Sequence, residues 1–167
     1  MRYTQQGYTF ETEVAEGLAL IDGWYCKVPD TRSGRMRCPR CKLMVKTLIM
    51  TRAPCDFIHI TPTAKCIFLE AKSTIQRSFP EINIKAHQLE TGCNIEALGT
   101  SYYFIIYMKS FKRVFSIHAK AAYKHFLHKG CLSIKDLEDT GVELERKTAR
   151  YHPDKKSAFI TFNSILT

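Results

Sequence analysis

The sequence has no hydrophobic segment long enough to cross a membrane. Its longest strongly apolar run is YYFIIYM at 102–108, whereas a membrane-spanning helix needs about 20 apolar residues. The opening residues, MRYTQQGY, are not followed by the apolar core of a signal peptide. We therefore expect a soluble protein of the cytoplasm that does not associate with membranes.

The sequence also lacks a disulfide framework. Its 7 cysteines are scattered, which fits reduced thiols in a reducing compartment. Cys38 and Cys41 form a CxxC pair, but a structural zinc needs four ligands, and no second CxxC or HxxxH stands at a suitable spacing. Cys26 and Cys55 would complete a zinc site only if the chain between them folded back. We favour a simple turn at Cys38 over a zinc site.

The sequence has fewer acidic residues than basic ones. The chain has 25 Lys and Arg against 16 Asp and Glu, for a net charge of +9. This excess indicates a polyanionic partner, most simply a nucleic acid, with solubility alone as the alternative. Residues 31–53 hold no acid at all, and we expect them to contact DNA, with a solvated loop as the alternative. The seven basic side chains of this segment are Arg32, Arg35, Arg37, Arg40, Lys42, Lys46 and Arg52.

The hydrophobic pattern indicates one mixed α/β domain over residues 1–167, large enough to bury its own core. A central sheet flanked by helices is expected, and the segment 31–53 is expected to project from it as a hairpin or stalk-like insertion. The predicted helices are 8–21, 81–98, 119–128 and a short one capped by Ser133. The predicted strands are 24–28, 55–60, 65–72, 102–108, 113–118 and the tail segment AFITF at 158–162.

Two strands joined by the turn Thr61-Pro62-Thr63 carry the most informative charges. Alternate side chains of a strand share a face, so Glu70 and Lys72 point the same way. Asp56 lies at the open end of the same hairpin, across from the end that carries Glu70. The geometry therefore permits Asp56, Glu70 and Lys72 to converge.

A carboxylate pair beside a lysine suits metal-dependent cleavage of a phosphodiester. Two oxygen ligands fit a hard cation such as Mg²⁺, which stabilises developing charge and delivers a hydroxide-like nucleophile. The lysine can orient a water or stabilise charge on the phosphate. The alternative is that Glu70 and Lys72 form a solvated face of an edge strand, since short strings of this kind also occur by chance.

Two further polar side chains lie on predicted apolar helix stripes. Glu11 lies at the edge of the stripe of the first helix and can reach the same end of the sheet. Gln88 lies in the middle of the stripe formed by Ile84, Ile95 and Leu98. A core glutamine with satisfied hydrogen bonds is one interpretation of Gln88, and a side chain aimed at the site beside Glu70 is the other.

Taken in order, these residues resemble the PD-(D/E)xK nuclease superfamily, and within it the RecU-type Holliday junction resolvases. The resemblance extends over most of residues 5–140, and FLEAKST and SFPEINIKAHQLE are its most specific pieces. QGYTFETEV, APCDF and, less closely, LSIKDLED match further family segments. The matched positions are Gly7, Thr9, Glu11, Asp56, Glu70, Lys72, Ser78, Phe79, Pro80, His87 and Gln88. One departure is Cys55, where the family usually has a threonine.

The resemblance implies a restriction-endonuclease-like fold and a homodimer that binds four-way DNA junctions. It implies symmetric cleavage of opposed strands with Mg²⁺ or Mn²⁺, and no nucleotide cofactor. Metal ligands would be Glu11, Asp56 and Glu70, with Lys72 and Gln88 as further catalytic residues. Two alternatives remain: another nuclease of this superfamily, restriction-like or acting in repair, and a junction-binding protein of the same fold without activity.

The histidines at 118, 125 and 128 lie on or beside a predicted basic helix. No acid is close to them in the sequence, so we expect them to face solvent or phosphate rather than a metal. The aromatic residues of 102–108, including Tyr102, are expected to be core residues of a strand rather than a platform for stacking bases.

Overall fold

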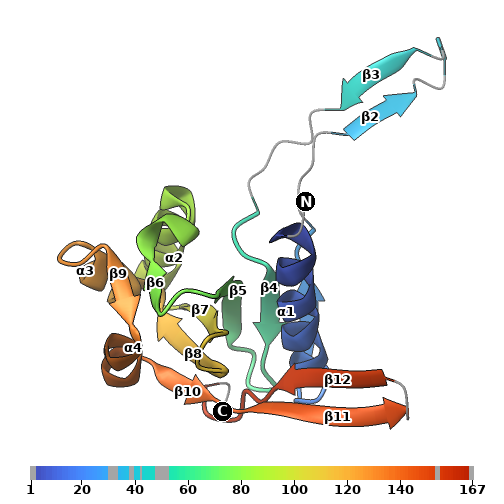
Figure 1. Ribbon diagram of the computed structural model, residues 1–167. Coiled ribbons are helices and arrows are strands. Elements are labelled where there is room, and N and C mark those ends of the chain that lie inside the picture. Colours follow the sequence, from blue (N-terminus) through green and yellow to red (C-terminus); the bar gives the residue numbers. More distant parts are fainter. Residues whose placement is uncertain are drawn as a thin grey trace.

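The computed structural model describes residues 3–29, 34–37, 40–41, 43–47, 53–152 and 155–165. Its centre is a six-stranded mixed sheet in the order β1-β4-β5-β7-β8-β10 (Figure 1). These strands are β1 (Trp24–Lys27), β4 (Phe57–Ile60), β5 (Cys66–Thr74), β7 (Ser101–Met108), β8 (Arg113–His118) and β10 (Val142–Leu144).

Strand direction decides which residues meet at each edge of this sheet. β5 and β7 run parallel, connected through the helix α2 (Ala86–Ala97), and β4 and β8 run antiparallel to them on either side. β5 and β7 therefore end together, with Thr74 beside Met108. We call the end of the sheet at which β5 and β7 finish the exit edge. The opposite end, at which both strands begin, is the entry edge.

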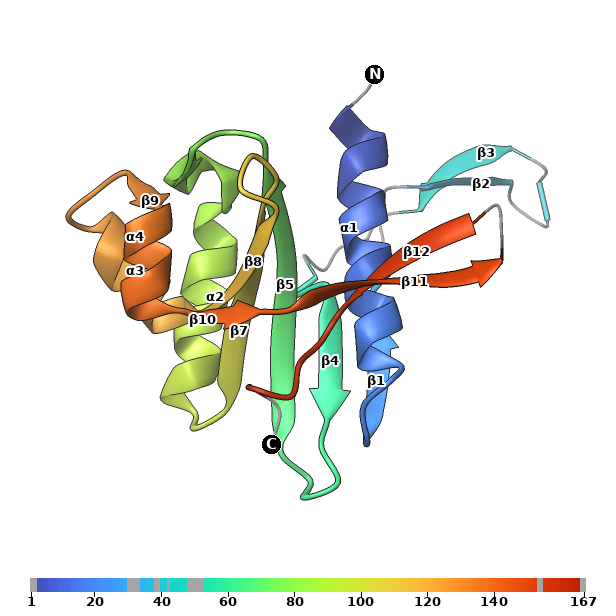
Figure 2. The ribbon, with the colours of Figure 1, turned by 60° about the horizontal axis from the view of Figure 1, so that its bottom comes forward.

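Both faces of the sheet are covered, which explains the long apolar runs of its central strands. The helix α1 (Tyr3–Leu18) packs on one face through Phe10, Val14 and Leu18, as its periodicity predicts. On the other face, α2 and the helix α3 (Ala119–Phe126) pack over Phe104 and Ile106. Figure 2 shows this separation of α1 from α2 and α3 by the sheet. The expected α/β class with a mixed central sheet is confirmed.

The insertion contains a hairpin, as expected. β2 (Gly34–Arg37) pairs with β3 (Met44–Thr47) in an antiparallel register that places Arg35 opposite Lys46. Figure 1 shows this hairpin standing away from the central sheet and from all the helices. Arg40 and Cys41 at its tip are exposed. Of the predicted DNA contacts, Arg32, Lys42 and Arg52 lie outside the described residues, as does Cys38.

The helix predicted at 81–98 differs from the observed structure at both ends. Residues Glu81–Asn83 form a separate 3₁₀ turn, and the backbone of Ile84 and Lys85 is extended before α2 begins. Ile84 is buried as expected, but Leu98 is 84% exposed. The placement of Leu98 on the buried stripe was wrong because α2 ends at Ala97 and the chain turns at Gly99, where φ is +83°.

Several short elements were not predicted. β6 (Ser78–Pro80) pairs with β9 (Cys131–Ser133). The helix α4 (Ile134–Thr140) that follows, with Ser133 as its N-cap, is the short capped helix that was predicted. β11 (Arg146–His152) and β12 (Lys155–Ile160) form a two-stranded ribbon that crosses α1, of which only the β12 part had been expected (Figure 2). In the described residues, no helix is long and apolar enough to cross a membrane.

Candidate active site

Asp56 lies where the β4–β5 hairpin opens at the exit edge. Its backbone N–H donates to the Leu69 carbonyl at 3.1 Å, one step beyond the last paired residues of β4. Its carboxylate then takes the place of a backbone acceptor, because the N–H of Ala71 donates to Asp56 Oδ2 at 2.8 Å. The side chain is thereby fixed beside the middle of β5.

Glu70 and Lys72 share a face of β5, as the strand period predicts. Lys72 Nζ lies 2.7 Å from Glu70 Oε1, and Glu70 is only 2% exposed. The pair is therefore not a solvated face of an edge strand. β5 lies between β4 and β7 in the interior of the sheet.

Gln88 reaches the same carboxylate from the helix above. Its Nε2 donates to Glu70 Oε1 at 2.5 Å, and its Oε1 accepts the backbone N–H of Lys85 at 3.0 Å. One side chain thus caps the start of α2 and holds Glu70. Gln88 is thus both a buried glutamine with satisfied hydrogen bonds and a side chain that reaches Glu70, so the two interpretations left open by the sequence are compatible.

Glu11 approaches from the α1 side. Its carboxylate pairs with Lys27 Nζ at 2.7 Å rather than with another site residue. Its negative charge nevertheless raises the pKa values of both Asp56 and Glu70, so it lies within electrostatic reach of them. The structure therefore collects all five predicted catalytic residues in one region, with Glu11 at its margin.

The two inner carboxylates, the buried Glu70 and the half-buried Asp56, lack a full complement of positive charge. Burial, followed by repulsion from Glu70, raises the pKa of Asp56 to about 7. Burial also raises the pKa of Glu70, against the lowering effect of Lys72. Because both acids resist ionisation, a divalent cation between them would stabilise their charged forms. Such a donor set suits Mg²⁺ or Mn²⁺.

The carboxylates are not yet gathered around one point. Among the described residues, no three His, Cys, Asp or Glu side chains already form a metal-binding group. The physical reason is visible in the ion pairs, since Lys27 holds Glu11 and Lys72 holds Glu70. The ligand set Glu11, Asp56 and Glu70 stays a prediction, and so does the simple turn favoured at Cys38, which lies outside the described residues.

The departure at Cys55 has a structural explanation. Its thiol donates to the Phe57 carbonyl at 3.1 Å and is buried. Burial, together with the nearby charge of Glu70, raises the thiol pKa to about 12, so the group stays a neutral donor. A thiol can thus make the bond to the backbone beside Asp56 for which a hydroxyl is expected.

Tyr102 is a site-supporting residue that the sequence did not reveal. Its hydroxyl donates to the Pro54 carbonyl at 2.9 Å, two residues before Asp56. Burial, and then the charge of Glu70, raises the pKa of this hydroxyl, so the phenol end lies beside the carboxylates. Tyr102 is a core residue as expected, but its polar end supports the floor of the site. A buried tyrosine hydroxyl requires a partner, and that was the available signal.

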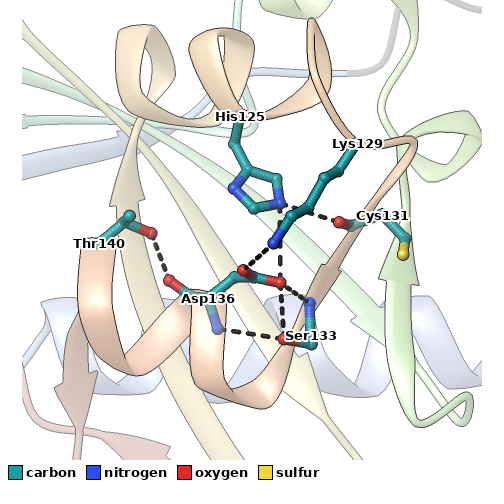
Figure 3. A network of polar contacts seen from close by, with 6 residues as sticks. All are labelled: His125, Lys129, Cys131, Ser133, Asp136 and Thr140. Atoms are coloured by element: carbon teal, nitrogen blue, oxygen red, sulfur yellow. Dashed lines mark hydrogen bonds and ion pairs between the residues drawn. The ribbon is translucent and has the colours of Figure 1, made fainter.

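The expectation that no acid stands near the histidines was wrong. His118 Nδ1 lies 2.6 Å from Glu96, and His125 Nε2 lies 3.7 Å from Asp136 and 3.0 Å from the Cys131 carbonyl. Figure 3 shows His125 and Lys129 converging on Asp136 beside the cap of α4. This network fastens β9, whose partner β6 leads into the helix of Gln88.

The residues on either side of the basic insertion are hydrogen-bonded close to Asp56. On its N-terminal side, the N–H of Val28 donates to the Asp56 carbonyl at 2.8 Å. On its C-terminal side, Pro54 is held by Tyr102. Val28 and Pro54, which flank the segment 31–53 on its two sides, are therefore both held close to Asp56.

Comparison with known proteins gives a family and a distant structural likeness. The model of the family "Recombination protein U" (RecU) matches residues 28–153, well over half of the 167-residue chain. No curated protein matches in sequence. The solved structure of Hjc from Archaeoglobus fulgidus, a Holliday junction resolvase from an archaeal hyperthermophile, is similar at 12% identity and a TM-score of 0.42. That similarity covers 59% of this chain and 78% of the archaeal one. On the family match, the chain belongs to the RecU family of Holliday junction resolvases.

Proposed function

We propose that this chain is a metal-dependent endonuclease that resolves four-way DNA junctions as a homodimer by symmetric cleavage of two strands. The observation that carries the proposal is the convergence of Asp56, Glu70 and Lys72 at the exit edge in a chain of the RecU family. The carboxylates of Asp56 and Glu70, whose pKa values are raised, provide the oxygen ligands that Mg²⁺ or Mn²⁺ prefers.

Each site residue has a role that follows from its contacts. Asp56 and Glu70 would hold the metal, with Glu11 as a third carboxylate once it leaves Lys27. A bound divalent cation supplies a Lewis acid and lowers the pKa of a coordinated water. Lys72 would place its ammonium against the phosphate or the attacking water. Gln88 would orient Glu70 through its amide N–H.

The basic hairpin supports a junction over a plain duplex as substrate. It is rooted beside Asp56 and projects away from the fold (Figure 1). Seven positive charges without a counter-charge would repel one another unless they meet solvent or a polyanion. A projection of this kind fits the open centre of a four-way junction, which a linear duplex does not have.

The test is cleavage of a mobile four-way junction beside linear duplex, flap and single-stranded DNA, with Mg²⁺ or with EDTA. Wild type should cut the junction with Mg²⁺ alone, and Asp56→Asn or Glu70→Gln should abolish cleavage. Binding of the junction should survive or tighten, because a negative charge that faces phosphates has been removed. Glu90→Gln, an exposed acid on the same helix as Gln88, is the control and should cut normally.

Three outcomes would contradict the proposal. Full activity in EDTA or in Asp56→Asn would overturn the catalytic assignment. Equal cleavage of duplex and junction would indicate a different nuclease of the superfamily. Tight junction binding without cleavage, with either Mg²⁺ or Mn²⁺, would indicate a junction-binding protein without activity.

A further inference from the structure

Two loops at the exit edge form one continuous surface beside the candidate active site. The segment after β5 and the turn between β7 and β8 are joined by two hydrogen bonds. The Lys109 N–H donates to the Thr74 carbonyl at 2.9 Å, and Ser110 Oγ donates to the Gln76 carbonyl at 3.2 Å. Figure 2 shows the ends of β5 and β7 at the same side of the sheet. The two loops therefore present their side chains together.

This surface combines exposed apolar and exposed basic side chains. Ile75 is 60% exposed and Phe111 is 39% exposed, although both are large and apolar. Arg77 and Lys112 flank them and are also exposed. Within the part of the chain that the structure describes, no acidic side chain pairs with Arg77 or Lys112. We call Ile75, Arg77, Phe111 and Lys112 the exit-edge surface.

The next basic residue along the chain, Arg113, is not available to a ligand in the same way. Arg113, directly after Lys112, is paired with Glu138 and Glu143 and is therefore neutralised. The positive charge available to a ligand thus begins at Lys112 and extends toward Arg77.

The backbone of Lys112 adds an independent observation. Its φ is +55°, in the left-handed region that glycine adopts most easily. A lysine in this position keeps a charged side chain at the cost of local strain, and such strain concentrates at functional sites. The substitution Lys112→Gly removes the positive charge and relieves the backbone strain at the same time, which makes it an informative test variant.

We propose that the exit-edge surface binds the DNA arm that flanks the cut. The inference rests on the proposed function, because it assumes that the scissile phosphate lies at Lys72. A strand rises about 3.3 Å per residue, which puts this surface roughly 10 Å beyond Lys72. Phosphates of one DNA strand follow each other about 3.4 Å apart along the axis. Arg77 and Lys112 therefore meet phosphates about three nucleotides from the cut, and Ile75 and Phe111 cover the adjoining sugars.

The experiment measures junction binding against salt concentration in the Asp56→Asn background, which separates binding from cleavage. The double variant Arg77→Ala/Lys112→Gly should flatten the log–log salt slope by about 1.8, at about 0.9 per phosphate contact. Its affinity should fall roughly tenfold or more. Lys65→Ala, an exposed lysine at the entry edge, is the matched control, and each of its binding parameters should equal that of Asp56→Asn alone.

Two further measurements separate weaker DNA binding from unfolding and test the apolar part of the surface. The melting temperature of Lys112→Gly should equal or exceed that of its parent, which excludes unfolding as the cause of weaker binding. Phe111→Ala should lose hydroxyl-radical protection about three nucleotides from the cut, whereas Leu98→Ala at the entry edge should keep it. An unchanged salt slope in the double variant, or an unchanged footprint in Phe111→Ala, would overturn the inference. Cleavage by wild type, measured separately, decides the proposed function, so each can fail without the other.

Discussion

Tyr102 holds the segment that carries Asp56, through a single hydroxyl. Removing that hydroxyl in Tyr102→Phe should leave the fold intact and cost about 1 kcal/mol of unfolding free energy. The Pro54 carbonyl then loses its partner and Asp56 loses its support. We expect the Mg²⁺ concentration for half-maximal cleavage to rise about tenfold, as for other supports of metal ligands. A metal titration of the cleavage rate measures this.

The adjacent tyrosine is the control for this prediction. Tyr103 lies on the other face of β7, against His118 at 4.3 Å between ring centroids, and away from the carboxylates. Tyr103→Phe should leave the metal dependence of cleavage unchanged. An identical metal requirement for Tyr102→Phe and wild type would mean that the hydroxyl serves stability alone.

His59 makes the stability of the fold sensitive to acid. Its ring is 1% exposed, and neither nitrogen has a hydrogen-bond partner among the described residues. It lies on β4 between Tyr25 of β1 and Ile67 of β5, with Gly23 against it. Burial alone lowers its pKa below the ordinary value of 6.5.

The sign of this effect follows from proton linkage. The unfolded chain binds a proton at His59 below pH 6.5, whereas the folded chain binds it only at a lower pH. The contribution of His59 to folding stability should therefore fall as the pH drops through 6 toward 5, by about 1.4 kcal/mol per pH unit at most, whereas the raised pKa values of Asp56 and Glu70 act in the opposite direction. In urea denaturation at pH 8 and pH 5, the change in the free energy of unfolding should be more favourable in His59→Phe than in wild type, and His128→Gln should match wild type. Equal changes in wild type and His59→Phe would refute this prediction.

Local contacts were predictable at the residue scale, and distant ones were not. Glu70 and Lys72 meet because a strand repeats every two residues, and Asp56 joins them through a short hairpin. By contrast, Tyr102 and Pro54 are 48 residues apart, and His118 and Glu96 are 22 apart. No periodicity relates such positions, so these partners became visible only in the folded chain.

At the scale of elements, we expect the β2–β3 hairpin to give the protein its preference for four-way junctions over linear duplex. Arg35, Arg37 and Arg40 lie in its strand and tip. Replacing all three by alanine should flatten the salt slope of junction binding by roughly two to three, at about 0.9 for each phosphate contact. Linear duplex should be affected less, because it has no central opening for the hairpin. Salt titrations of both substrates with wild type and the triple variant measure the difference. Equal weakening on both would make the segment a general phosphate clamp.

Long elements were predictable, and several of the shortest were not. The apolar periods of α1, β7 and β8 extend over many residues and indicate their type directly. β6 and β9 have three residues each, and they exist only because Phe79 and Leu132 are buried against the same core. The extended backbone at Ile84 and Lys85 follows the 3₁₀ turn Glu81–Asn83, and α2 begins only where the Gln88 side chain accepts the Lys85 N–H.

At the scale of the whole molecule, the proposed reaction requires two active sites related by a two-fold axis. A homodimer with one site in each protomer is the simplest arrangement that cuts opposed strands. We therefore expect light scattering to give twice the chain mass of 19.2 kDa at micromolar concentration. A monomer under these conditions, both with and without junction DNA, would contradict the expectation.

The helix that carries Glu11 is fastened by a distant part of the chain. Arg146 binds Glu13 through two hydrogen bonds of 2.7 Å, across 133 positions in the sequence, and Ile160 and Phe162 pack against Gly17. During translation, the hairpin with Asp56 and Glu70 leaves the ribosome long before these residues exist. A nascent chain therefore lacks the Arg146–Glu13 ion pair and the contacts of Ile160 and Phe162, so its first helix is held only by the sheet residues made earlier, such as Phe57 and Leu69.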